Sequence, residues 1–114
     1  MLQRAQSLSG SGVADAASDR RWFAVYTSPR HEKSAARHFE TRSLDAFLPL
    51  YKVTRHWKHR QSTFELPLFP SYVFVRIAPE ERIKVLTTPG VLYIVSTKGV
   101  PAEIQHREIG ALRL

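Results

Sequence analysis

Aromatic side chains at alternate positions of two short segments are the strongest sign of a binding surface in this sequence. In residues 72–77 an aliphatic set alternates with an aromatic one, so one strand face suits a core while the other carries Tyr72 and Phe74. The same alternation in residues 22–27 places Tyr26 on the matching face. Aromatic rings left uncovered on a sheet form a contact surface for another molecule, unless a loop or helix of the same chain covers them.

Positive charge is concentrated in the middle third of the chain. The formal net charge is +7, and residues 28–60 carry eight Lys and Arg against three Asp and Glu, together with four of the five histidines. A local basic excess is typical of a surface that meets a polyanion, and solvation alone is an equally good explanation.

Other chemistries lack the residues they need. The absence of cysteine excludes disulfides, thiolate zinc sites and cysteine nucleophiles. His56 and His59 have no third ligand at a recognisable spacing and lie beside basic residues, so no metal site is expected. No phosphate-binding loop, dinucleotide fingerprint or paired carboxylates are present, so we expect a non-enzyme without a cofactor or small-molecule substrate. No apolar stretch approaches the roughly twenty residues that span a bilayer, so no membrane association is expected.

The elements that must position these residues alternate between strands and helices. Residues 1–20 are poor core material and are expected to form a disordered tail, followed by one domain over residues 21–114. The order β-α-β-(hairpin)-β-α-β-α predicts an α+β fold, in which helices pack on one face of an antiparallel-dominated sheet. This is a split βαβ sandwich of RNA-recognition-like shape. The expected strands are 22–27, 46–57 with an interruption at Pro49, 63–66, 72–77 and 91–97; the expected helices are 31–43, 79–86 and 101 onward.

Three stretches together cover about residues 22–112. In chain order they are Trp22-Phe-Ala-Val-Tyr26-Thr with Glu32, Pro67-Leu-Phe-Pro-Ser-Tyr-Val-Phe-Val75, and Thr88-Pro-Gly-Val91 with Val95 and Val100-Pro101. In this order they resemble the N-terminal domain of NusG-type transcription elongation factors. Ser71 stands where the family usually has glycine, a departure that is similar to specialised antitermination paralogues such as RfaH, LoaP and UpxY.

The resemblance implies a partner and a set of contact residues. The family's N-terminal domain binds the clamp helices of the largest RNA polymerase subunit and suppresses pausing or termination. Tyr26, Tyr72 and Phe74 match the family's clamp-binding aromatics, and Phe69 is a further candidate that could instead pin the start of the strand.

The resemblance also implies a weaker contact between the first helix and the non-template DNA strand. His38 matches a polar contact position of the specialised paralogues, and Arg42 lies one turn later on the same flank. A solvated helix face explains both residues almost equally well. The basic cluster from Lys52 to Arg60 is a further DNA candidate, since this side of the family's domain faces upstream DNA.

Two other functions are compatible with the sequence. The first is a single-stranded RNA-binding domain of RNA-recognition type, although no Lys, Arg or Gly precedes the aromatics of residues 72–75 as that class requires. The second is a small ribosome-associated protein, which leaves the aromatic face unexplained.

The resemblance to NusG-type factors also implies a monomer that acts in the cytoplasm, associated with the nucleoid and with transcribing polymerase. The family's C-terminal KOW domain is not found in this chain.

Overall fold

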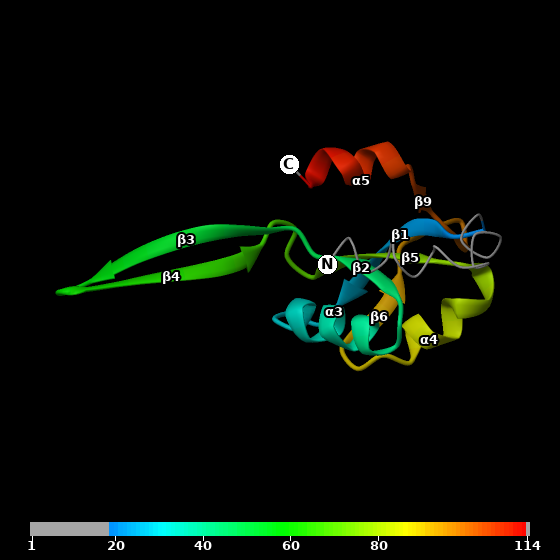
Figure 1. Ribbon diagram of the computed structural model, residues 1–114. Coiled ribbons are helices and arrows are strands. Elements are labelled where there is room, and N and C mark those ends of the chain that lie inside the picture. The colour runs from blue at the N-terminus through cyan, green and yellow to red at the C-terminus, as the bar shows by residue number, and fades with distance from the viewer. Residues whose placement is uncertain (1–18, 114) are drawn as a thin grey trace.

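A sheet with the strand order β2-β5-β1-β6 lies at the centre of the computed structural model, which describes residues 19–113 (Figure 1). All its strand pairs are antiparallel, and short β9 pairs with β1 beside Trp22 and Phe23. In chain order the elements are β1 Arg21–Thr27, α3 Glu32–Thr41, β2 Asp45–Phe47, β3 Leu50–Trp57, β4 Arg60–Pro67, β5 Tyr72–Ile77, the 3-10 turn η1 Pro79–Glu81, α4 Arg82–Leu86, β6 Val91–Ile94, β7 Ser96–Thr97, β8 Val100–Pro101, β9 Glu103–Ile104 and α5 His106–Leu112. The predicted α+β class with an antiparallel sheet is confirmed.

The main core lies between the sheet and the helices α3 and α4. The aliphatic faces of β1 and β5 form the sheet side of this core, as their alternation predicts. On the helix side, Phe39 of α3 is the largest fully buried side chain. Burial of this apolar surface is the main favourable contribution to folding. The buried members are Val25, Ala35, Phe39, Leu44, Val73, Val75, Ile77, Val85 and Ile94.

The prediction that the helices share one face of the sheet is wrong for the last helix. Figure 1 shows α5 on the opposite side of the sheet from α3 and α4. There Ile109 is buried against Trp22 and Phe74 in a second core cluster, with Ile104 and Leu112 packed at its edge. The physical reason is the apolar surface of that face, which would otherwise leave an indole and a phenyl ring in water.

Several boundaries differ from the predicted ones. Pro101 and Glu103–Ile104, expected to begin the last helix, belong to the short strands β8 and β9, because Pro101 pairs with Ser96 and Ile104 pairs with Trp22. The turn between the expected strands 46–57 and 63–66 shortens to two residues, since Trp57 pairs with Arg60. Residues 1–18 of the expected tail lie outside the described residues, while Arg20 forms an ion pair with Glu81 at 3.2 Å.

A buried carboxylate joins α3 to the turn before β5. Glu32, at the start of α3, is almost fully buried, and its Oε2 accepts a hydrogen bond from the Ser71 backbone N–H at 2.7 Å. Ser71 has a positive φ of 71°. This left-handed conformation is unfavourable for any residue other than glycine, because its Cβ approaches the backbone too closely. On the other side, the Ser71 carbonyl accepts the Thr27 N–H at 2.8 Å. The turn is therefore held from both α3 and β1.

We expect Glu32→Ala to lower the free energy of unfolding by about 1.5–3 kcal/mol, because it removes a charged acceptor and leaves a partly buried N–H without a partner. Glu32→Gln keeps an oxygen acceptor and should lose less. Urea unfolding measures both. Glu65→Ala removes an exposed carboxylate from the hairpin and serves as the control, with a change within about 0.5 kcal/mol. Equal losses in the Glu32 and Glu65 variants would contradict a structural role for this bond.

Candidate functional site

A row of three tyrosines crosses three neighbouring strands. Tyr26 of β1 is paired in register with Tyr72 of β5 on one side and with Tyr93 of β6 on the other. The Tyr26 and Tyr72 ring centroids are 5.3 Å apart in an edge-to-face arrangement, and those of Tyr26 and Tyr93 are 5.0 Å apart and stacked. Directly opposite residues on one sheet face have Cβ atoms about 5 Å apart, so the register alone brings these rings together.

Phe69 extends this surface towards the other end of the face. Its ring lies edge-to-face on Phe74, with centroids 5.9 Å apart, and 40% of Phe69 stays exposed. We call Tyr26, Tyr72, Tyr93 and Phe69 the aromatic patch. Tyr93 is 51% exposed, while Tyr26 and Tyr72 are half-buried. The patch therefore offers rigid apolar rings and hydroxyl groups together, the composition of many protein-binding hot spots.

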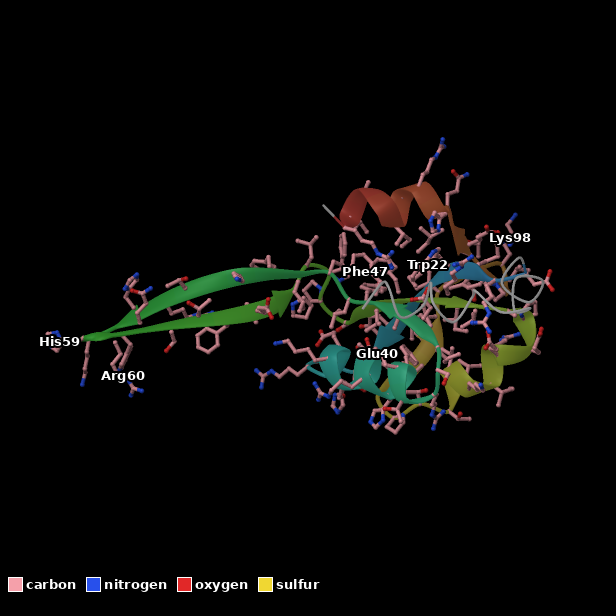
Figure 2. The ribbon with its side chains drawn as sticks, viewed as in Figure 1. Trp22, Glu40, Phe47, His59, Arg60 and Lys98 are labelled. Atoms are coloured by element: carbon pink, nitrogen blue, oxygen red, sulfur yellow. The ribbon has the colours of Figure 1, made fainter. Side chains whose placement is uncertain are left out.

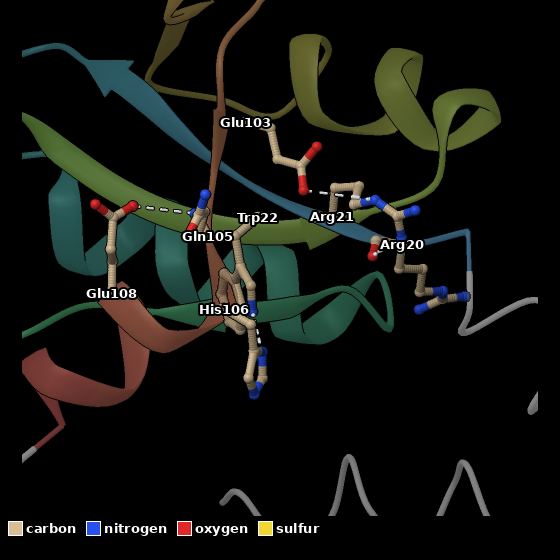
Figure 3. Close-up of polar contacts among 7 residues, drawn as sticks. All are labelled: Arg20, Arg21, Trp22, Glu103, Gln105, His106 and Glu108. Carbon is tan, nitrogen blue, oxygen red and sulfur yellow. Dashed lines mark hydrogen bonds and ion pairs between the residues drawn. The ribbon is translucent and has the colours of Figure 1, made fainter.

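Helix α5 covers the part of the sheet next to the patch. Its attachment is partly polar, since the Trp22 Nε1–H donates to His106 Nδ1 at 3.2 Å (Figure 3). The Glu108 carboxylate accepts the Gln105 N–H at 3.1 Å and so closes the first turn of the helix. At the other end, the Arg113 guanidinium lies over the Trp22 ring at 5.3 Å and over the Phe47 ring at 4.8 Å.

The burial of Phe74 corrects one expectation. Its alternation put it on the predicted face, but α5 covers that part of the face and leaves Phe74 only 8% exposed. Phe74 thus lies beneath Phe69 as support. Tyr26, Tyr72 and Phe69 remain accessible, and Tyr93 joins them without having been predicted. The run 91–95 is apolar at every position and has no alternation from which a face could be assigned.

The two predicted DNA contacts lie in different surroundings. His38 is exposed in the last turn of α3. Arg42 follows the helix, and its Nη1 donates to the Lys84 carbonyl at 2.8 Å, to Thr87 Oγ1 at 3.0 Å and to Thr88 Oγ1 at 3.3 Å. Arg42 therefore ties the end of α3 to the end of α4, a role that the sequence alone did not indicate.

The basic hairpin β3–β4 projects from the body, with His59 and Arg60 at its far end (Figures 1 and 2). In the part of the chain that the structure describes, His, Asp and Glu side chains nowhere gather in threes that could hold a metal ion. None of the helices between residues 19 and 113 has the length and apolar character needed to cross a bilayer.

Comparisons with known proteins identify relatives of this chain. Residues 20–113 match the family model described as "NusG: Transcription termination factor nusG". No curated protein matches the chain. Among solved structures, one described as "Domain interaction in Thermotoga maritima NusG" is similar, with 26% sequence identity and a TM-score of 0.60. The match covers 82% of this chain and 55% of that one, so this chain corresponds to about half of the Thermotoga maritima protein.

We expect Ile109→Ala to loosen α5 and to expose Trp22. Truncating a buried isoleucine costs about 2–5 kcal/mol, and Ile109 is fully buried against Trp22. In a Trp57→Phe background, Trp22 is the sole tryptophan, and its fluorescence emission should shift to the red. Ile83→Ala makes the same change at a 66% exposed position on α4 and should leave the emission unchanged. A buried-type emission from the Ile109 variant would contradict this role of α5.

Proposed function

Because the chain belongs to the NusG family of transcription factors, whose members are not enzymes, we propose that it is an elongation and antitermination factor. In this proposal it binds the clamp helices of the largest RNA polymerase subunit and suppresses pausing or termination. It acts as a monomer in the cytoplasm, on transcribing polymerase in the nucleoid. The observation that carries the proposal is the aromatic patch, which occupies the sheet surface beyond α5.

The chemistry of the patch favours a protein helix as its partner. Tyr26, Tyr72 and Tyr93 present ring faces and edges within a few ångströms of one another, while Phe69 adds an apolar ring beside them. A helix presents side chains three and four residues apart on one face, and such a row can fill the spaces between fixed rings. The rings are already ordered by their mutual contacts, so little side-chain entropy is lost on binding.

The single-stranded RNA-binding alternative is disfavoured by α5. RNA-recognition domains stack bases on aromatics of the two central strands. Here the β1–β5 pair carries Phe74 at its centre and Trp22 towards one end, and both are buried under α5. The half of the sheet that would receive bases is therefore already occupied by the chain itself.

We further propose that His38 and Arg42 contact the non-template DNA strand while the aromatic patch holds polymerase. Exposed basic residues of α3 support this proposal, since Lys33 and Arg37 also lie on its solvent side. Arg42 remains partly exposed despite its bonds to α4. Phosphate contacts from such side chains orient a protein on DNA and weaken as salt rises.

We expect Tyr93→Ala to weaken binding to isolated clamp helices by about 30-fold, since truncation of an aromatic anchor typically costs about 2 kcal/mol. Tyr72→Ala and Phe69→Ala should have similar effects. Phe74→Ala is a poor test, because it removes a buried ring and should destabilise the fold by about 3–5 kcal/mol. Titration of a clamp-helix fragment by calorimetry measures the affinity.

Phe64→Ala is the matched control, because Phe64 is similarly exposed but lies on the hairpin. It should bind the clamp helices as the unchanged chain does. Full affinity in the Tyr93, Tyr72 and Phe69 variants together would remove the basis of the clamp-helix proposal.

We expect His38→Ala to leave clamp-helix binding intact and to weaken pause suppression by about 2- to 10-fold, the effect of one lost hydrogen bond. A single-round transcription assay with a defined pause measures it. Thr41→Ala is the control, since the Thr41 hydroxyl donates to the Arg37 carbonyl within the same helix. Unaltered pausing with His38→Ala would show that this face of α3 is merely solvated.

A further inference from the structure

The β3–β4 hairpin carries its Tyr, Trp and Phe side chains on one face. Eight residue pairs join the two strands, from Leu50 opposite Pro67 to Trp57 opposite Arg60. Because side chains alternate between faces, the register divides the hairpin completely. One face carries the polar pairs Lys52–Glu65, Thr54–Thr63 and His56–Gln61, with the apolar pair Leu50–Pro67 at the base of the hairpin. The other carries Tyr51–Leu66, Val53–Phe64, Arg55–Ser62 and Trp57–Arg60.

The second face exposes three aromatic rings with two arginines between and beside them. Trp57 is 71% exposed, and Tyr51 and Phe64 are each 46% exposed. We call these three rings with Arg55 and Arg60 the aromatic–arginine face. Successive pairs on one face are about 7 Å apart along the strand, so these rings and guanidinium groups are spread over roughly 20 Å. A shallow hollow on the hairpin is lined by four residues of this face and by His56; the four are Arg55, Trp57, Ser62 and Phe64.

Support of the hairpin itself explains only part of this face. A cross-strand contact between Val53 and Phe64 stabilises an antiparallel pair by about 0.2–1 kcal/mol. Trp57, however, lies at the last pair before the turn, opposite Arg60, and leaves most of its indole in water. A ring of that size at the exposed end of a ribbon is best explained by an external partner.

The charge of the hairpin identifies the class of this partner. Residues 50–67 contain four Lys and Arg, two histidines and Glu65 as the sole acid. Two copies of this ribbon would repel each other, whereas a polyanion would be attracted. A duplex hides the faces of its bases, so exposed rings gain most from an unpaired strand whose bases can stack on them.

The polar groups of the face favour DNA over RNA. Arg55 and Arg60 are donors without acceptor capacity, which suits phosphate oxygens. A ribose 2′-hydroxyl both donates and accepts, but the side-chain acceptors that its O–H could use on this face are the hydroxyls of Ser62 and Tyr51. Burying 2′-hydroxyls against the rings would therefore leave most of their O–H groups without an acceptor.

We propose that the aromatic–arginine face binds single-stranded DNA, with bases stacked on Trp57 and Phe64 and the phosphates bound by Arg55 and Arg60. This site is separate from the aromatic patch and from the His38 surface of α3. It needs no polymerase, so its test is independent of the function proposed above.

The test is binding of the whole 114-residue chain to labelled oligothymidine of about twelve nucleotides, measured by fluorescence anisotropy at low salt. The unchanged chain should bind, and Trp57 emission should be quenched as bases stack on the indole. Trp57→Ala should weaken binding about 5- to 100-fold, the range for one lost base–aromatic stack. Trp57→Phe keeps a ring and should recover part of the affinity, which separates stacking from damage to the hairpin.

The matched control is Thr54→Ala on the opposite face, which should bind as the unchanged chain does. Lys52→Gln removes a charge from that same polar face, and its loss should be small and disappear as salt rises. Equal affinity of Trp57→Ala and the unchanged chain would overturn the proposal. Tighter binding of duplex DNA would overturn it in favour of groove binding, and equal or tighter binding of oligouridine would overturn the assignment to DNA.

Discussion

The bond between the Glu32 carboxylate and the Ser71 N–H holds the turn from which β5 and its part of the aromatic patch begin. Ser71 adopts a left-handed backbone conformation, which costs about 1–2 kcal/mol for a residue with a side chain. The buried acceptor at 2.7 Å offsets this cost and fixes the direction in which β5 leaves the turn. Phe69 and Tyr72 stand on either side of Ser71, so the same bond holds the turn that joins Phe69 to the tyrosine row. The helix α3, which packs in the main core, and the aromatic patch thus share one anchor.

Alternation in the sequence was enough to predict the centre of the fold. The aliphatic faces of β1 and β5 lie in the main core, and Tyr26 and Tyr72 lie together on the other face, as predicted. Both strands alternate cleanly because one side packs aliphatic side chains against α3 and α4, whereas the other carries aromatic rings that α5 covers only in part. Tyr93 could not be assigned in the same way, because its strand is apolar throughout. A register irregularity between Tyr26 and Thr27 also breaks the simple pairing with β6.

Contacts between residues far apart in the chain were beyond the reach of local patterns. The last seven-residue helix carries too few apolar positions to reveal which sheet face it covers, so the burial of Phe74 depended on three-dimensional packing. The bonds from Arg42 to residues 84–88 likewise join positions more than forty residues apart. The sequence pattern predicted a solvent-facing flank for Arg42, because no residue near it in the sequence offers an acceptor.

The guanidinium of Arg42 has a mechanical consequence for the domain. By bonding two threonine hydroxyls and a carbonyl at once, it couples the ends of α3 and α4 beneath the sheet. A displacement of one of these helices must therefore displace the other, so α3 and α4 move together relative to the sheet.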